Sequence, residues 1–348
     1  MKDNPNIKDF IHNTLESAAA RKIKIKNDIQ ASRKSDETDD PIDVFVYDPI
    51  AIRLTYLFIK LGWSANTVTL LSLVFGVGGA VLLYPKDVLL NLLGIACEIF
   101  AAVLDCSDGQ VARLSHTSTP FGRVLDGAVD MTNYIAIYLA LGFRLMNETV
   151  PLTDKISIHL SWYIWIVIVM AMIFHAGQAR MADYYRGLHL YFLKGSSDAY
   201  MARSKNLRKE LTDLPEGTSR FKKLYMKLYL LYTVVQETGA QHTQQILDKI
   251  DENGGGIPEE LAKRYTDQSR KWIQITNVLS YNIRTYTLFL LLLLGKEIYF
   301  FLFVFIILQG LKYAMIARYE TMAGHIYNEF YGEDPEKTAE TDTDENSL

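Results

Sequence analysis

The sequence contains six runs of mostly apolar residues. They cover residues 66–83, 88–104, 127–146, 156–179, 275–294 and 298–315. Each run is close to the roughly 17 to 25 residues that a helix needs to cross a bilayer, and a backbone in hydrocarbon must satisfy its own hydrogen bonds, so we expect six helices. The runs lack the polar stripe, with a period of 3.6 residues, that marks a helix on the surface of a soluble protein. The sequence therefore predicts an all-α integral membrane protein with six transmembrane helices rather than a soluble helical protein.

Basic residues are distributed unevenly between the two ends of these runs. On one side the short connections hold single lysines, namely Lys86 in 84–87, Lys155 in 147–155 and Lys296 in 295–297. The other side carries Arg113, Arg123 and the segment 183–274, which is rich in lysine and arginine. Cytoplasmic loops carry the excess of these residues, so this side and both termini are predicted to be cytoplasmic. The start of the chain, MKDNPNIKDF, lacks the apolar stretch of a cleavable signal peptide.

Polar and apolar segments together predict five regions. These are a charged N-terminal arm at 1–47, an interfacial helix with the first four spans at 48–182, a cytosolic helical insertion at 183–274, the last two spans at 275–318 and an acidic tail at 319–348. The arm is expected to be partly helical and to lie on the anionic lipid surface. The tail has the composition of a disordered segment.

The stretch YDPIAIRLTYLFIKLGW precedes the first span and predicts a helix in the membrane interface. Asp48 is expected to be its N-cap and Pro49 its first helical residue, because both residue types favour those positions. Bulky apolar residues then alternate with Arg53 and Lys60, as in helices that lie in the plane of the interface. In the insertion, FKKLYMKLYLLYTVVQ is amphipathic and basic and indicates a helical subdomain on the membrane surface. The net charge of −4 argues against a nucleic-acid partner.

Four aspartates, Asp105, Asp108, Asp126 and Asp130, stand between the second and third runs. A charge inside a membrane costs roughly 2.5–3.5 kcal/mol even on insertion scales, so such residues indicate function. The first two are three residues apart and the last two are four apart, so each pair shares one helical face. A reversing loop at 114–121 is expected to bring the two pairs together.

Converging carboxylates without histidine or cysteine form an oxygen-only site, which suits Mg²⁺ or Mn²⁺ rather than zinc. Two such ions would cancel the charge and keep open positions for phosphate oxygens, so two divalent cations are the predicted cofactors. Gly109 and Ala112 leave a helix face with little side chain, so that a phosphorylated ligand can approach the backbone. Arg113 is expected to balance a phosphate or to support a carboxylate.

These residues follow a fixed pattern: Asp105-x2-Asp108-Gly109-x2-Ala112-Arg113-x8-Gly122-x3-Asp126-x3-Asp130. The pattern resembles the signature of the CDP-alcohol phosphotransferases (CDP-alcohol phosphatidyltransferases), class I, and the six spans agree with that family's architecture. The resemblance covers residues 48–182 and 275–318 and leaves out the arm, the insertion and the tail. It implies that a substituted phosphate passes from a CDP-linked donor to an alcohol hydroxyl, with release of CMP, in phospholipid biosynthesis.

The resemblance also implies roles for individual residues. Asp105, Asp108 and Asp126 would ligate the metals, and Asp130 would complete the second metal site and act as general base. The CDP-binding residues would be Asn66, Thr69, Asp108, Gly109, Ala112, Arg113 and Gly122. Asn66 and Thr69 are included because they belong to SANTVTLLSL, which is similar to the family's Pro-Asn-x-x-Thr segment, although Ala65 stands where proline is usual. Helix capping by Ser64 or Asn66 explains this segment equally well.

Three arginines are candidates for binding the acceptor. Arg180 and Arg186 lie in FHAGQARMADYYRG, at the expected cytosolic mouth of the fourth span, in a stretch that loosely resembles family members that use CDP-diacylglycerol. Arg284 accompanies Asn277, Ser280 and Asn282 in an otherwise apolar run and is expected to face the protein interior. Arginines favour a phosphorylated or anionic acceptor. An equal alternative is that Arg180 and Arg186 bind no substrate and only extend from the helix end to the water.

Other conspicuous residues have simpler interpretations. His116 is expected to be an ordinary loop residue, and His159 and His175 packing or hydrogen-bonded residues of the fourth span. Gly76, Gly78 and Gly79 predict a close helix contact within the membrane, as part of a homodimer interface. Cys97 and Cys106 lie nine residues apart on opposite faces of one helix and are expected to be unbridged, small buried residues.

The favoured substrates are CDP-diacylglycerol and an inositol or inositol phosphate, or another polar alcohol. The alternative is a choline or ethanolamine phosphotransferase acting on diacylglycerol or a ceramide-like lipid, and the signature does not separate the two because it concerns the shared CDP part. A divalent-cation transporter is a remote alternative, because it would place carboxylates near the midplane along a pathway. A membrane scaffold would have no use for the four carboxylates.

Overall fold

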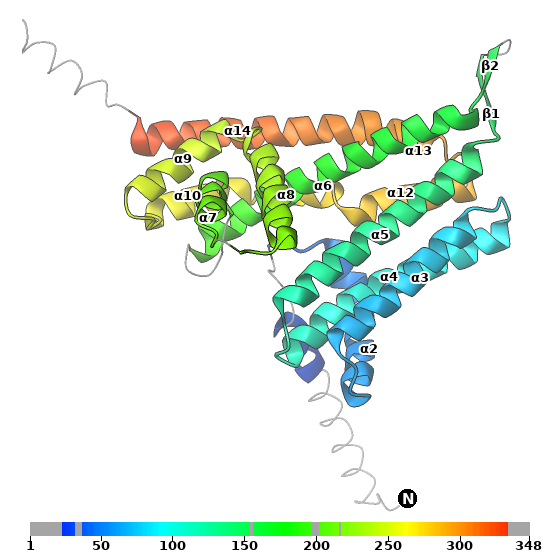
Figure 1. Ribbon diagram of the computed structural model, residues 1–348, viewed down its shortest axis with the longest axis horizontal. Helices are drawn as coiled ribbons and strands as arrows, with labels where there is room; N and C mark the ends of the chain where they lie inside the picture. The colour runs from blue at the N-terminus through cyan, green and yellow to red at the C-terminus, as the bar shows by residue number, and fades with distance from the viewer. Residues whose placement is uncertain (1–22, 32–36, 154–155, 196–201, 216, 333–348) are drawn as a thin grey trace, which may run out of the picture. The chain divides into compact units, whose positions relative to one another are not determined.

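The computed structural model describes residues 23–31, 37–153, 156–195, 202–215 and 217–332, and they are mostly helical (Figure 1). The N-terminal arm up to residue 22, the acidic tail from residue 333 and Lys155 lie outside the described residues. The chain divides into two compact units. The first comprises the chain up to Met172 with Tyr286–Phe301, and the second comprises Ile173–Thr285 with the chain from Leu302.

The first unit is built on three long helices that run side by side (Figure 1). They are α3 (Ala65–Leu83), α4 (Val88–Leu114) and α5 (Pro120–Leu145), and α3 contacts both of the others. The predicted reversal after the second run is confirmed, since α4 ends at Leu114 and α5 begins at Pro120, where Thr119 caps the helix by accepting a hydrogen bond from the Gly122 amide. This reversal gives the cluster of aspartates its shape.

The helix before the first span begins earlier than predicted. Asp40, not Asp48, caps it, because the Asp40 carboxylate accepts a hydrogen bond of 2.8 Å from the Ile42 amide. Helical backbone then continues through the π-helical turn η1 (Asp43–Tyr47) into α2 (Asp48–Lys60), which packs on α4. This part of the chain contains two Asp-Pro pairs, Asp40-Pro41 and Asp48-Pro49, and a wide turn ahead of Pro49 relieves the clash that proline causes inside an α-helix. Asp48 instead accepts a hydrogen bond of 3.1 Å from the Gln110 side chain.

Five helices of the described residues are long and apolar enough to cross a membrane, which indicates an integral membrane protein. The predicted span at 275–294 is not one helix but two, α11 (Ile273–Val278) and α12 (Tyr281–Leu293). The Ser280 hydroxyl donates a hydrogen bond of 2.6 Å to the Asn277 carbonyl at the break. Such local bonds compete with helix formation. The prediction of six spans is therefore not confirmed, and α12, with 13 residues, is too short to cross a bilayer even without tilt.

The fourth span also begins later than predicted. Residues 156–159 are not helical, since β2 (Ile156–His159) pairs antiparallel with β1 (Thr149–Thr153). A short 3₁₀ turn, η2 (Ser161–Tyr163), leads into α6 (Ile164–Lys194), which continues past residue 182, where the insertion was expected to begin. Alternating β-branched residues in ISIH favour a strand, and apolar content alone does not distinguish such a strand from the start of a helix.

Glycines let α3 and α4 approach closely. A Cβ on Gly94 would lie 2.9 Å from the Gly79 carbonyl oxygen, and one on Gly79 would lie 3.0 Å from the Gly94 carbonyl oxygen. Gly76 faces the side chain of Asn133 on α5, whereas nothing lies within 4 Å of the position that a Cβ on Gly78 would take. The predicted close helix contact is confirmed within the chain at Gly76 and Gly79 but not at Gly78, and the homodimer interface stays a prediction.

A buried arginine fixes the opposite ends of these helices. Arg144 on α5 donates from Nε to Glu297 across 2.7 Å, and both side chains are 4% exposed. Its Nη1 donates to the carbonyls of Leu83 and Pro85 and to the Asn91 side chain at 2.9, 2.7 and 2.8 Å. One guanidinium thus joins α5, the α3–α4 connection and the segment before α13 (Tyr299–Leu302).

The second unit contains the helices of the insertion and the end of the chain. They are α7 (Ser204–Thr212), α8 (Arg220–Glu237), α9 (Gln241–Glu252), α10 (Glu259–Ser269), α11, the π-helical turn η3 (Phe303–Leu308) and α14 (Gln309–Tyr331). α9 and α10 pack on α14, and α7 packs on α8. Buried Arg203 bonds to both Asp248 and Asp251 of α9, at 2.7 and 2.5 Å.

Candidate metal centre

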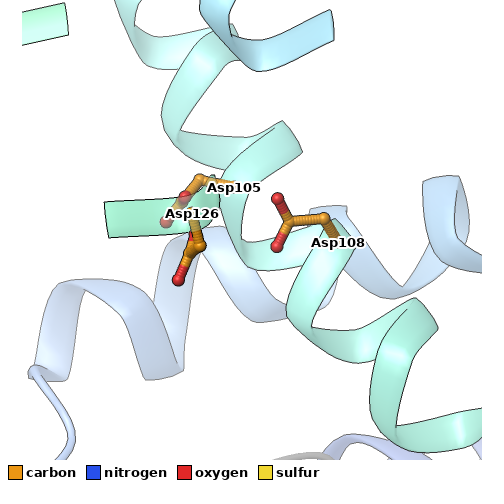
Figure 2. Close-up of side chains that lie close together, drawn as sticks. All are labelled: Asp105, Asp108 and Asp126. Atoms are coloured by element: carbon orange, nitrogen blue, oxygen red, sulfur yellow. The ribbon is translucent and has the colours of Figure 1, made fainter. Parts of the chain in front are cut away.

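Three of the four predicted aspartates converge in the first unit. Asp105 and Asp108 stand one turn apart near the end of α4, and Asp126 stands on the second turn of α5 (Figure 2). One carboxylate oxygen from each lies within 4.8 Å of the other two. Asp108 is buried, and Asp105 and Asp126 are half-buried. The reversal between α4 and α5 therefore creates a compact acidic group at one end of the helix layer.

The start of α3 lies beside this group. The Thr69 hydroxyl is within 2.5 Å of Asp108 Oδ2 and orients that carboxylate. Ser64 caps the helix, since its side chain accepts a hydrogen bond from the Thr67 amide, and this decides between the two expected caps. Asn66 is left free of the capping role, and its Oδ1 lies 3.2 Å from the position of a Cβ on Gly122. Both residues of the second, weaker motif thus lie next to residues of the first.

Small residues of the signature lie against polar side chains. A Cβ on Gly109 would lie 2.8 Å from Nη2 of Arg113, which folds back along α4. A Cβ on Gly122 would meet Thr119 Oγ1 as well as Asn66 Oδ1, each at 3.2 Å. Gly109 therefore makes room for a guanidinium, and Gly122 lets the first turn of α5 approach the start of α3.

The chemistry of the donors fits a hard divalent cation. All donors are carboxylate oxygens, and Oδ1 of Asp105 is buried without a hydrogen-bond donor among the described residues. A buried oxygen of this kind is costly unless a cation or donor compensates it. Three carboxylates from two helices with no neutralising base among them are able to hold such an ion.

The match to a family model agrees with this geometry. Residues 63–188 match the family model described as CDP-alcohol phosphatidyltransferase. These residues are a CDP-alcohol phosphatidyltransferase domain. Members of the family are transferases of substituted phosphate groups that act in phospholipid biosynthesis on a CDP-alcohol, so the matched domain indicates an enzyme of this class. No curated protein and no solved structure matches the chain.

The matched region contains the whole signature and the start of α3. It extends from Trp63, just before the cap of α3, to Leu188 in α6. It ends before the insertion helices, so nothing in the family match describes α7 to α10.

Asp130 stands one turn after Asp126 on α5 and is exposed. It is not part of the group of three carboxylates whose oxygens lie within 4.8 Å of one another. Its predicted roles, as a metal ligand and as general base, therefore stay predictions. An exposed carboxylate one turn from a metal-binding group is accessible to a substrate that enters from solvent.

The three acceptor candidates lie in the second unit and all have protein partners. Arg180 of α6 stacks over the ring of Tyr232 at 5.6 Å, and Arg186 bonds to Asp183 at 2.7 Å. Arg284 is buried, as predicted, and its Nη2 donates to Gln178 Oε1 at 2.9 Å and to a backbone carbonyl. These contacts hold each guanidinium in place, and their roles in binding stay predictions.

The histidines and cysteines have no part in the acidic group. His116 is an exposed turn residue with φ 53°, and His175 lies on α6. His159 lies on β2 rather than on the fourth span, with its Nδ1 3.3 Å from the Thr149 hydroxyl. Cys97 and Cys106 are both free, as predicted, but they are half-buried rather than buried.

The sequence interpretation overlooked Glu98. This residue lies two turns before Asp105 on α4, is 1% exposed and contacts Gly79, and its Oε1 has no hydrogen-bond partner among the described residues. A glutamate inside an apolar run was the available signal, because intramembrane acidic residues are rare.

Proposed function

We propose that this phosphatidyltransferase catalyses a metal-dependent transfer of a substituted phosphate from a CDP-linked donor to an alcohol hydroxyl, with release of CMP. The convergence of Asp105, Asp108 and Asp126 from two helices is the observation that carries the proposal. We propose that these three residues and Asp130 hold two Mg²⁺ or Mn²⁺ ions. Such ions supply charge neutralisation on the phosphate oxygens and orient the groups for in-line displacement.

The remaining signature residues would bind the CDP part. Asn66 and Gly122 lie side by side at the starts of α3 and α5, and Thr69 contacts Asp108, so these residues would provide polar groups and space for the nucleotide. Gly109 and Ala112 lie one turn apart on α4 and would place little side chain of their own between this helix and the diphosphate. Arg113, which stands over Gly109, would balance phosphate charge.

Asp130 is proposed as the general base. Its exposed carboxylate would accept the proton of the acceptor hydroxyl as that oxygen attacks the phosphorus, and the phosphoanhydride bond to CMP would break. The new bond joins the acceptor oxygen to the phosphorus of the donor group. CMP leaves with its phosphate.

The proposed donor is CDP-diacylglycerol, and the proposed acceptor is an inositol, an inositol phosphate or another polar alcohol. Three arginines support an anionic acceptor, because guanidinium groups bind phosphate in a bidentate manner. We place the site and both termini in the cytoplasm because of the distribution of lysine and arginine. Separately, we expect the protein to be a homodimer.

The test is CMP release by the purified full chain in nanodiscs, with each CDP-linked donor paired with each acceptor. We expect release only with Mg²⁺ or Mn²⁺, and its loss in Asp126→Asn and Asp130→Asn. The matched control is Asp87→Asn, since Asp87 caps the other end of α4 and asparagine caps equally well. Equal release by wild type and Asp130→Asn would show that Asp130 is not the base. A lipid product that retains label from CDP-choline would instead identify a choline phosphotransferase.

A further inference from the structure

The polarity of α8 is reversed relative to a helix on the surface of a soluble domain. Its most exposed apolar side chains lie four, three and four residues apart, and hence on one face. They are Leu224, Leu228, Leu231 and Val235, with exposed fractions between 43% and 60%. Among the described side chains of α8, only Thr233 and Gln236 are buried. A helix that exposes leucine and buries threonine and glutamine is arranged for an apolar surrounding.

The inward face of α8 is anchored to α6. Gln236 Nε2 donates a hydrogen bond of 3.2 Å to the Arg180 carbonyl, and the Arg180 guanidinium stacks on the Tyr232 ring. These contacts fix the rotation of α8 about its own axis. The apolar stripe therefore points outward because of polar contacts on the opposite side.

Basic and aromatic residues border the apolar stripe. Arg220, Lys223 and Lys227 are exposed and lie along one edge of it, at helical positions close to Leu224 and Leu231. Tyr225 and Tyr232 lie along the other edge and are also exposed. Tyrosine rings with one apolar and one polar end, and lysines beside leucines, are typical of a helix that lies in a membrane interface.

We propose that α8 binds the bilayer as an interfacial helix. Leu224, Leu228, Leu231 and Val235 enter the boundary between headgroups and acyl chains, and Arg220, Lys223 and Lys227 contact anionic headgroups. A bilayer is always available to this helix, because five helices of the same chain are able to cross one. The basic edge complements anionic lipid and provides no comparable attraction to an identical α8 of a second chain.

Spin labelling of the full chain tests the depth of the stripe. In a chain with Cys97→Ala and Cys106→Ala, a nitroxide is placed at Leu228→Cys on α8 or, as a control, at Glu260→Cys on the exposed face of α10. In vesicles of phosphatidylcholine with phosphatidylglycerol, we expect the label at 228 to collide more with oxygen than with a water-soluble nickel complex, and the label at 260 to show the reverse. Equal access of the nickel complex to both labels would overturn the proposal. So would exclusion of both reagents from position 228, since that outcome means that protein, such as a second copy, covers the stripe.

The basic edge is tested by varying the lipid. Replacing phosphatidylglycerol with phosphatidylcholine should reduce the oxygen preference at position 228 severalfold, and a chain with Arg220→Gln, Lys223→Gln and Lys227→Gln should no longer respond to this change. Lys249→Gln, an exposed lysine on α9, is the matched control and should respond like wild type. A triple variant that responds like wild type would contradict the role of the basic edge. None of these residues belongs to the metal centre, so a failure here is separate from a failure of the proposed function.

Discussion

The hydroxyl of Thr69 contacts the carboxylate of Asp108 across 2.5 Å and joins the start of α3 to the end of α4. The same hydroxyl lies 3.0 Å from the Ala65 carbonyl within its own helix. Asp108 therefore has one oxygen oriented by the protein before any ligand binds. Partners of this kind that orient a metal ligand typically change metal affinity by 10–100-fold.

We predict that Thr69→Val weakens the binding of the metal to a measurable extent. The concentration of Mg²⁺ or Mn²⁺ that gives half-maximal CMP release should rise about 10–100-fold, because valine keeps the shape of threonine but cannot orient Asp108. Thr69→Ser keeps the hydroxyl and should stay close to wild type. Titration of CMP release with each metal measures the effect.

The two variants together separate orientation of Asp108 from contact with the nucleotide. If Thr69 acts on the nucleotide, the KM for the donor should rise in Thr69→Val while the metal titration stays unchanged. A rise in KM alone would refute the orienting role.

The sequence was sufficient to predict the convergence of three of the four aspartates, while Asp130 lies outside the group. Spacings of three and four residues placed each pair of aspartates on one helical face, and the apolar runs on either side placed the reversal at the correct loop. Both features are local, so no knowledge of distant contacts was needed. Asp105, Asp108 and Asp126 converge as predicted.

Errors arose where local signals compete. Asp40-Pro41 and Asp48-Pro49 carry the same start signal, and only the bond from the Ile42 amide to Asp40 decides between them. The apolar run at 275–294 contains Ser280, whose side chain bonds to the backbone and breaks the helix. Hydropathy alone does not register either contact.

The contact between Gly79 and Gly94 predicts a position-specific effect of alanine. Gly94→Ala should destabilise the chain, because its Cβ would meet backbone oxygen at 2.9 Å and the two helices would have to separate. Gly78→Ala, on the open side of α3, should be neutral or stabilising by up to about 1 kcal/mol through helix propensity. Thermal unfolding in one detergent compares the two. Equal midpoints would mean that the α3–α4 contact is not tight.

The buried pair of Arg144 and Glu297 predicts an asymmetric loss of stability. Arg144→Met should cost about 3–5 kcal/mol, because it leaves a buried carboxylate without its partner and removes the hydrogen bonds to three further acceptors. Glu297→Gln should cost less, since the guanidinium keeps its other acceptors. Arg123→Met, an exposed arginine on the same helix, is the control. Denaturant unfolding of the full chain measures these losses. An equal loss of stability in Arg144→Met and Arg123→Met would contradict the structural role of the buried pair.

The insertion should lose stability in acid through Asp248. Burial on its own raises the pKa of Asp248, but hydrogen bonds from Lys205 and Arg203 outweigh it and hold the pKa below the ordinary value of 3.8. A carboxyl group whose pKa is lowered by folding stabilises the fold above its unfolded pKa, and this stabilisation is lost as the pH falls through the folded value. The α7–α9 contact should therefore be constant near neutral pH and weaken below about pH 4. Hydrogen exchange of α9 amides, taken at each pH as the ratio between Asp248→Asn and wild type, measures the contribution. That ratio should be large near neutral pH and approach one in acid, and the control Asp213→Asn, at the end of α7, should stay near one throughout. A ratio for Asp248→Asn that does not change with pH would show that the carboxylate does not stabilise the insertion.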